Sequence, residues 1–136
     1  MTKPARYSTA ATLKKPSQMF APDHVQELAL LRQNMRILRE EIDKKDAPVY
    51  WLEFFLLVAE MGEEGITTVD ASEIIGITQG IASRIVKIFS RYPNPVTGKT
   101  EGYDLIVEAR DSVYRQRQRV FLSEHGKKLI ARIAGI

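Results

Sequence analysis

Cysteine is absent from the sequence, which excludes disulfide bonds, thiolate metal sites and thiol redox sensing. Histidine is scarce as well: His24 and His125 lie far apart, without the short spacing that paired metal ligands show. The segment Gly98-Lys99-Thr100 is similar to the end of a phosphate-binding loop, but the upstream glycine and the preceding strand are missing. No nucleophile–base pair stands out. We therefore expect no catalytic residue, no cofactor and no metal site, and we do not expect an enzyme.

Long hydrophobic runs are also missing. No apolar stretch approaches the roughly 20 residues that a membrane-spanning helix requires, and the basic N-terminus has no apolar segment of the kind found in secretory signals. We therefore expect a soluble, cytoplasmic protein. Hydrophobic residues make up 44% of the 136 residues, which is enough for a packed core and for one domain with room for terminal arms.

The charges are distributed unevenly along the chain. Residues 1–22 contain four Lys or Arg and no acid, whereas residues 23–73 contain five cations and twelve acids. Residues 74–136 contain eleven cations and five acids, and the whole chain carries a formal charge of +3. Lys and Arg side chains contact nucleic-acid phosphates. The excess of positive charge in residues 74–136 therefore favours a DNA-binding surface there.

Residues 67–91 predict two short helices joined by a tight turn. The first helix is expected from about Thr68 to Ile75 and the second from about Gln79 to Arg91. Gly76 can adopt a positive φ and end the first helix. The hydroxyl of Thr78 can cap the second helix by accepting a hydrogen bond from a free backbone N–H. This spacing is typical of a helix-turn-helix.

The second of these helices has two different faces. Apolar residues recur at helical spacing along one face, and they are Ile81, Ile85, Ile88 and Phe89. The opposite face carries Gln79, Gly80, Ser83, Arg84, Lys87 and Arg91. No acid interrupts it, and a carboxylate there would repel DNA, so the composition suits a recognition helix in the major groove. The alternative is an ordinary core-forming helix pair with a cationic outer face.

The N-terminal third predicts an arm followed by a long helix. Residues 1–22 contain three prolines and no sustained periodicity, and we expect a basic, flexible arm. Its cations could touch DNA, but a solvated tail or a strand on a partner subunit is the preferred interpretation. A helix is expected from about Asp23 to Lys45, with a heptad-like apolar seam of Leu28, Leu31, Met35, Leu38 and Ile42. We interpret it as a dimerisation helix rather than one that packs only on its own domain.

A second helix, Val49–Met61, is apolar nearly all round and is expected to be the buried centre of the domain. After the helix-turn-helix, residues 92–104 are expected to form a long loop because they contain two prolines and two glycines. Two strands, Leu105–Arg110 and Arg117–Leu122, then predict a β-hairpin, and Ser123 is expected to cap a last helix, Glu124–Ala134.

Arginine alternates with glutamine at the second strand of this hairpin. Arg115, Arg117 and Arg119 are two residues apart, so they share one face of an extended chain. Arginines on such a hairpin suit the minor groove, where the negative potential is strongest when the groove is narrow. The alternative is an edge strand that is protected against aggregation by its charge.

The order of these elements resembles the winged-helix regulators of the MarR type. The resemblance rests on residues 74–86, on residues 115–127 and on residues 49–62. It implies a mainly α fold with a small β-hairpin wing, in which residues 23–136 form the winged helix-turn-helix domain. Three departures are visible: Tyr114 replaces the acid that usually precedes the wing arginines, the loop at 92–104 is longer, and a single helix follows the wing. Dimerisation would therefore depend on the N-terminal helix and arm.

These observations predict a homodimeric regulator that binds specific sequences of double-stranded DNA. Gln79 and Arg84 are expected to read base edges, while Thr78, Ser83 and Lys87 contact phosphates. The remaining expected DNA-binding residues are Gly80, Arg115, Arg117 and Arg119. The resemblance also suggests a small-molecule inducer, for which no residue can be named. The alternative function is a protein-interaction or replication and packaging accessory module with weak or no DNA specificity.

Overall fold

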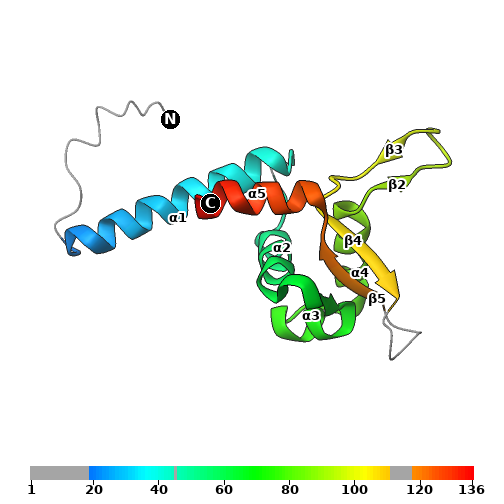
Figure 1. Cartoon of the computed structure of the whole chain (residues 1–136), viewed down its shortest axis with the longest axis horizontal. Helices are drawn as coiled ribbons and strands as arrows, with labels where there is room; N and C mark the ends of the chain where they lie inside the picture. The colour runs from blue at the N-terminus through cyan, green and yellow to red at the C-terminus, as the bar shows by residue number, and fades with distance from the viewer. Residues whose placement is uncertain (1–18, 45, 111–117) are drawn as a thin grey trace. The chain divides into compact units, whose positions relative to one another are not determined.

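The computed structural model describes residues 19–44, 46–110 and 118–136 (Figure 1). The chain divides into two compact units, residues 1–36 and residues 37–136, and each is described by itself. The first unit contains most of α1, and the second contains all the other helices and strands that the structure describes.

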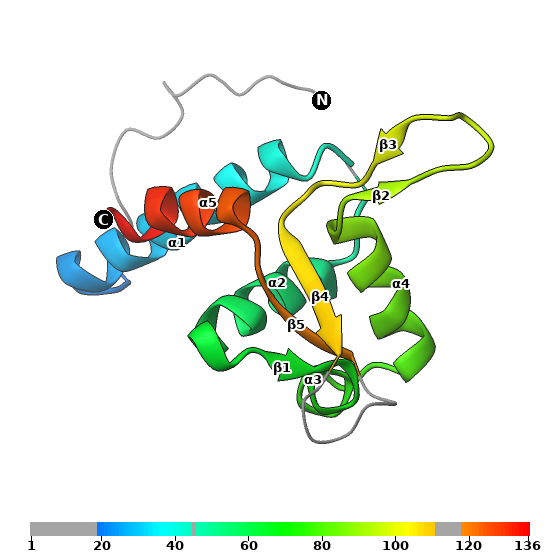
Figure 2. The same cartoon turned by 45° about the vertical axis from the view of Figure 1, so that its right-hand side comes forward.

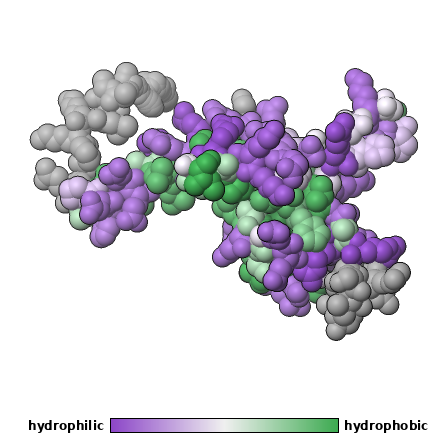
Figure 3. Space-filling model, viewed as in Figure 1, coloured by the Kyte–Doolittle hydropathy of each residue, from purple (hydrophilic) through white to green (hydrophobic). Residues whose placement is uncertain are grey.

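Helix α1 extends from Pro22 to Glu41 and passes from one unit into the other. In the first unit its seam residues Leu28, Leu31 and Met35 are exposed, and apolar residues interrupt the hydrophilic surface of α1 in Figure 3. In the second unit the seam continues into the core, where Leu38 and Ile42 are buried. The apolar seam predicted from sequence is therefore present. Its first part is exposed, and its second part is buried in the core.

The end of α1 differs from the prediction. The helix stops at Glu41 instead of continuing to Lys45. After a last helical hydrogen bond from the Ile42 amide to the Leu38 carbonyl, the Lys44 amide bonds to the Ile42 carbonyl at 2.6 Å and turns the chain. The helix therefore ends while the Ile42 side chain stays buried in the core. Helix propensity does not predict this end, because the end depends on tertiary packing.

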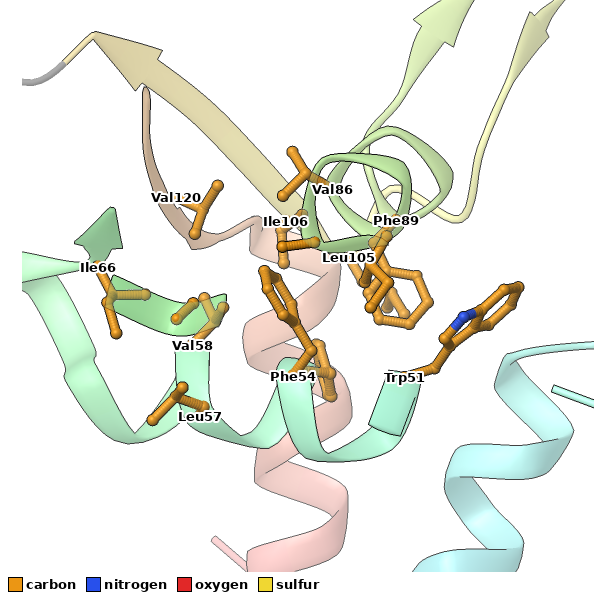
Figure 4. Close-up of a cluster of buried hydrophobic side chains, with 14 of the residues drawn as sticks. Trp51, Phe54, Leu57, Val58, Ile66, Val86, Phe89, Leu105, Ile106 and Val120 are labelled. Carbon is orange, nitrogen blue, oxygen red and sulfur yellow. The ribbon is translucent and has the colours of Figure 1, made fainter. Parts of the chain in front are cut away.

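Helix α2, Val49–Met61, is the centre of the second unit and has the bounds expected from sequence. Its inward residues pack against the strands and against Phe89 (Figure 4). The ring of Phe89 lies edge-on to Trp51 at 5.9 Å and to Phe55 at 6.3 Å between centroids, which is a favourable aromatic geometry. The buried residues of α2 are Trp51, Phe54, Phe55, Leu57 and Val58.

The predicted hairpin strands pair as expected and acquire a third partner. Strands β4 (Ile106–Arg110) and β5 (Gln118–Leu122) are antiparallel, with Val107 opposite Phe121. Strand β1 (Ile66–Thr67), which was not predicted, pairs with the other edge of β5 and gives the sheet order β1-β5-β4. A two-residue strand is too short to show the alternation from which strands are predicted. Residues 111–117, between β4 and β5, lie outside the described residues.

The prediction of a loop over residues 92–104 was wrong. Strands β2 (Tyr92–Pro93) and β3 (Thr100–Glu101) form a second antiparallel hairpin, which extends from the C-terminal end of α4 in Figure 2. The main-chain amide of Asn94 bonds to the Lys99 carbonyl, and Gly98 takes a positive φ of 72° in the turn. The sequence did not indicate these strands because the segment contains two prolines, and proline has no backbone N–H to donate to a β-ladder.

Helix α5 (Glu124–Ala134) ends the chain within the bounds predicted for it. The buried Ser123 fixes its start: the hydroxyl donates to the Asp104 carbonyl and accepts from the Gly126 amide at 2.9 Å. On its exposed side, His125 Nε2 lies 2.7 Å from a carboxylate oxygen of Glu41. Helix α5 therefore packs against the Leu105 carbonyl at Gly126 and contacts the end of α1 through His125.

Candidate nucleic-acid interface

The helix-turn-helix consists of α3 (Thr68–Ile75) and α4 (Gln79–Phe89). Gly76 ends α3 in the left-handed region with φ 84°, as its lack of a side chain allows. The hydroxyl oxygen of Thr78 accepts a hydrogen bond from the Ile81 amide at 3.1 Å and caps α4. Both assignments made from sequence are confirmed. Helix α4 ends at Phe89 rather than Arg91, because Ser90 is extended.

One side of α4 holds the helix on the core. Ala82, Ile85, Val86 and Phe89 are buried, whereas Ile81 and Ile88, predicted for the same stripe, are half-buried. The buried stripe is thus rotated slightly toward Ala82 and Val86, which sequence reasoning did not include. The rotation leaves the opposite side of the helix uncovered.

The polar side of α4 lies at the surface of the second unit. Every predicted DNA-binding residue of the helix-turn-helix is exposed, and these are Thr78, Gln79, Gly80, Ser83, Arg84 and Lys87. The helix contains no acidic residue between Gln79 and Phe89. An exposed helix face without carboxylates can approach phosphates and base edges without electrostatic repulsion.

A cleft of about 510 Å³ lies beside the C-terminal half of α4, between this helix and β4. Ser83, Lys87 and Arg91 line it on the helix side, and Asp104 and Glu108 line it on the strand side. The Lys87 ammonium lies 5.4 Å above the centre of the Tyr92 ring, also in this cleft. Tyr92 was not among the residues predicted for the site, and no pattern in the sequence links it to Lys87.

The wing arginines can be placed only in part. Arg115 and Arg117 lie outside the described residues. Arg119 lies inside the sheet, opposite Thr67 on one side and Ala109 on the other. One guanidinium nitrogen of Arg119 donates to the carbonyl of Glu64 at 2.8 Å and to that of Gly65 at 3.3 Å. Arg119 therefore ties β5 to the turn that follows α2.

The residues that the structure describes also bear on a metal site and on a membrane span. Those residues contain no group of three or more His, Cys, Asp or Glu side chains placed to hold a metal ion. Across the same residues, none of the helices is both long enough and apolar enough to span a bilayer.

Burial raises the pKa of Tyr103 above its ordinary value of 10.0, and the Asp43 carboxylate adds to the effect.

Comparisons of the whole sequence with protein-family models and with curated proteins find no match. Comparisons of the structure do find similar folds. A MarR transcriptional regulator from Methanosarcina mazei Go1 is 22% identical over 79% of this chain and 68% of its own, with a TM-score of 0.52. The S. aureus MepR–DNA complex is 14% identical over 81% of this chain and 80% of its own, with a TM-score of 0.54.

A third solved structure, a mutant of E. coli MarR complexed with operator DNA, is 12% identical over 84% of this chain and 72% of its own, with a TM-score of 0.52. The order of helices, the capped helix-turn-helix and the paired wing strands agree with this likeness. The chain has the winged helix-turn-helix fold of the MarR-type regulators.

Proposed function

We propose that the protein is a transcriptional regulator that binds specific sequences of double-stranded DNA as a homodimer. The observation that carries the proposal is the exposed, acid-free face of α4, held on the core by Ile85 and Phe89. Solved structures of similar fold include DNA complexes of MepR and of a mutant of E. coli MarR. Helix α4 would lie in the major groove, and each subunit would bind a half-site about one helical turn from the other.

The residues of α4 differ in the contacts that they can make. Arg84 and Gln79 have the forked donors and amide groups that read guanine and adenine edges. Ser83, Lys87 and Thr78 would bind phosphates. The Thr78 oxygen already accepts from Ile81, but its own O–H remains a donor.

Gly80 suits a close approach of DNA to α4. A methyl group at Gly80 would meet no atom nearer than the Thr78 hydroxyl oxygen at 3.9 Å, so packing within the chain does not require glycine there. Its backbone is not in the positive-φ region either. We infer that the absent side chain lets the helix backbone come close to the floor of the groove.

The wing would supply contacts in the minor groove through Arg115 and Arg117. Arg119 has a different role in this proposal, because it is hydrogen bonded to the carbonyls of Glu64 and Gly65. It would hold β5 in place against the segment that follows α2. The homodimer would form through the exposed seam of α1, whose apolar residues have no other assigned role.

The roles of Arg84 and Lys87 can be separated by selecting bound sequences from a pool of random duplexes. Arg84→Ala is expected to cost about 1–3 kcal/mol of binding and to relax the selected sequence at one position. Lys87→Ala is expected to weaken all sequences alike, since a phosphate carries no sequence information. Lys128→Ala on α5 removes the same charge elsewhere and serves as the control. Equal losses from both α4 variants on every duplex would refute these roles.

The second candidate is a protein-interaction or replication and packaging accessory module with the same fold. The β2–β3 hairpin favours it, because such an insertion offers an additional surface. This candidate predicts duplex binding that is absent or without sequence preference. Affinity for duplex DNA, measured against salt concentration, separates the two candidates, since phosphate contacts make affinity fall steeply with salt.

A further inference from the structure

The β2–β3 hairpin is organised around one carboxylate. Glu101 accepts hydrogen bonds from the side-chain amide of Asn94 at 2.7 Å, from the Thr97 hydroxyl at 3.2 Å and from the Tyr92 hydroxyl at 3.5 Å. The main-chain amide of Asn94 also bonds to the Lys99 carbonyl at 2.8 Å. These bonds join both strands and the turn, so the hairpin has a defined conformation despite its two-residue strands.

The base of the hairpin is fixed to the end of α4. The Tyr103 amide donates to the Ile88 carbonyl at 3.0 Å, and the Leu105 amide donates to the Phe89 carbonyl at 2.7 Å. Gly102 has a φ of 99° and lies so close to the helix end that a methyl group there would overlap the Ser90 carbonyl oxygen. These contacts satisfy carbonyls that a helix end otherwise leaves without partners, and they fix where Tyr92 stands relative to α4.

The Tyr92 ring faces the side chain of Lys87. The ammonium lies 5.4 Å from the ring centre, within the range of a cation–π contact. Asp104 and Glu108 line the same cleft, but in the described part of the chain no carboxylate is within ion-pair distance of Lys87. An aromatic ring orients a cation without neutralising it, so the charge of Lys87 stays available to an anion.

We propose that the β2–β3 hairpin is part of the DNA-binding apparatus and that Tyr92 is a positioning residue for Lys87. This inference rests on the proposed function and deepens it. The ligand of Lys87 is a phosphate of the duplex backbone. A free lysine loses rotamer freedom when it binds a phosphate. The Tyr92 ring restricts those rotamers beforehand, and the strand pairing and the backbone bonds at the hairpin base keep the ring in place.

The surface of the hairpin is consistent with this role. Most residues that it presents are hydrophilic or neutral in Figure 3. Val96 is a largely exposed apolar side chain at its tip, which is too little for an apolar docking site. The hydrogen bonds that give the hairpin its conformation extend from its turn, where the Gly98 amide donates to the Asn94 carbonyl at 2.8 Å, to its base next to Lys87.

A double-mutant cycle on duplex DNA tests the inference. The probe is a mixed-sequence duplex long enough for two half-sites, titrated with the wild type, Lys87→Ala, Tyr92→Leu, Tyr92→Phe and the Lys87→Ala/Tyr92→Leu double variant. Tyr92→Leu should weaken binding roughly two- to five-fold, the strength of an exposed cation–π contact. Tyr92→Phe keeps the ring and should bind like the wild type. In the Lys87→Ala background, Tyr92→Leu should have no further effect.

A second measurement detects the positioning without DNA. In the nuclear magnetic resonance spectrum of the free protein, the terminal methylene protons of Lys87 should be shifted upfield by the aromatic ring, and the shift should disappear in Tyr92→Leu but persist in Tyr92→Phe. Additive losses in the cycle, or unshifted Lys87 protons in the wild type, would overturn the inference alone. If the wild type binds no duplex, the proposed function fails and the inference fails with it.

Discussion

At the scale of single residues, two helical glycines have opposite surroundings. Gly126 lies in the first turn of α5, where a methyl group would be 2.1 Å from the Leu105 carbonyl oxygen. Gly80 lies in the first turn of α4, where a methyl group would meet open space apart from one atom at 3.9 Å. Close packing therefore requires glycine at the first position, and it does not require glycine at the second.

Gly126→Ala is expected to destabilise the fold by about 1–3 kcal/mol, as overpacking of a well-packed site does. Gly80→Ala is the matched control, and it is expected to be neutral or to stabilise by up to about 1 kcal/mol, because alanine is the better helix former. Urea unfolding of both variants measures the two free energies. Similar stability changes in the two variants would contradict the packing argument.

At the scale of elements, α2 packs against α4, the proposed recognition helix. Phe55 is fully buried and lies edge-on to Phe89 of α4, while its neighbour Leu56 is 42% exposed. Phe55→Ala is expected to cost about 3–5 kcal/mol, the range for a large buried aromatic residue. Leu56→Ala should cost no more than about 0.5–1 kcal/mol, since it lies near the surface. Thermal or urea unfolding distinguishes them, and equal losses would show that α2 is not oriented as described.

Sequence predicted the elements that local chemistry determines. The bounds of α2, α3 and α5, and the start of α4, follow from strong signals: a continuous apolar run, Gly76 at a helix end, and hydroxyl caps at Thr78 and Ser123. The pairing of β4 with β5 follows from alternating residues. These signals come from neighbouring residues, so they need no knowledge of the rest of the fold.

The elements that sequence missed depend on distant residues. Strand β1 exists because β5 offers it an edge, and the β2–β3 hairpin is fixed by the Glu101 carboxylate and by α4. In the candidate site, the exposed face of α4 was predicted residue by residue. The contact between Lys87 and Tyr92, and the bonds from Arg119 to Glu64 and Gly65, were not. Such pairs arise from tertiary geometry, which no spacing in one sequence encodes.

At the scale of the whole molecule, the exposed part of the α1 seam bears on assembly. The part of α1 in the first unit exposes Leu28, Leu31 and Met35, with Leu31 at 57% exposure. Exposed apolar residues at heptad spacing on one helix are typical of a surface that meets another helix. In the proposed dimer the partner is a second copy of this chain.

Leu31→Glu is expected to raise the dissociation constant of the dimer at least about tenfold, because burying an unpaired carboxylate costs more than about 1.4 kcal/mol. Gln33→Glu adds the same charge to an exposed position outside the seam and should leave the dimer intact. Sedimentation velocity over a range of protein concentrations measures both. A monomeric wild type, or equal dissociation of the two variants, would contradict dimerisation through α1.

The bonds between Arg119 and the carbonyls of Glu64 and Gly65 have a consequence for signal transmission. They join the wing strand to the short segment that follows α2, so a displacement of that segment would re-aim the wing. In the proposed regulator, a small molecule that prefers one position of the segment would thereby change the affinity for duplex DNA. Linkage requires the converse as well: operator occupancy would change the affinity for that molecule by the same factor.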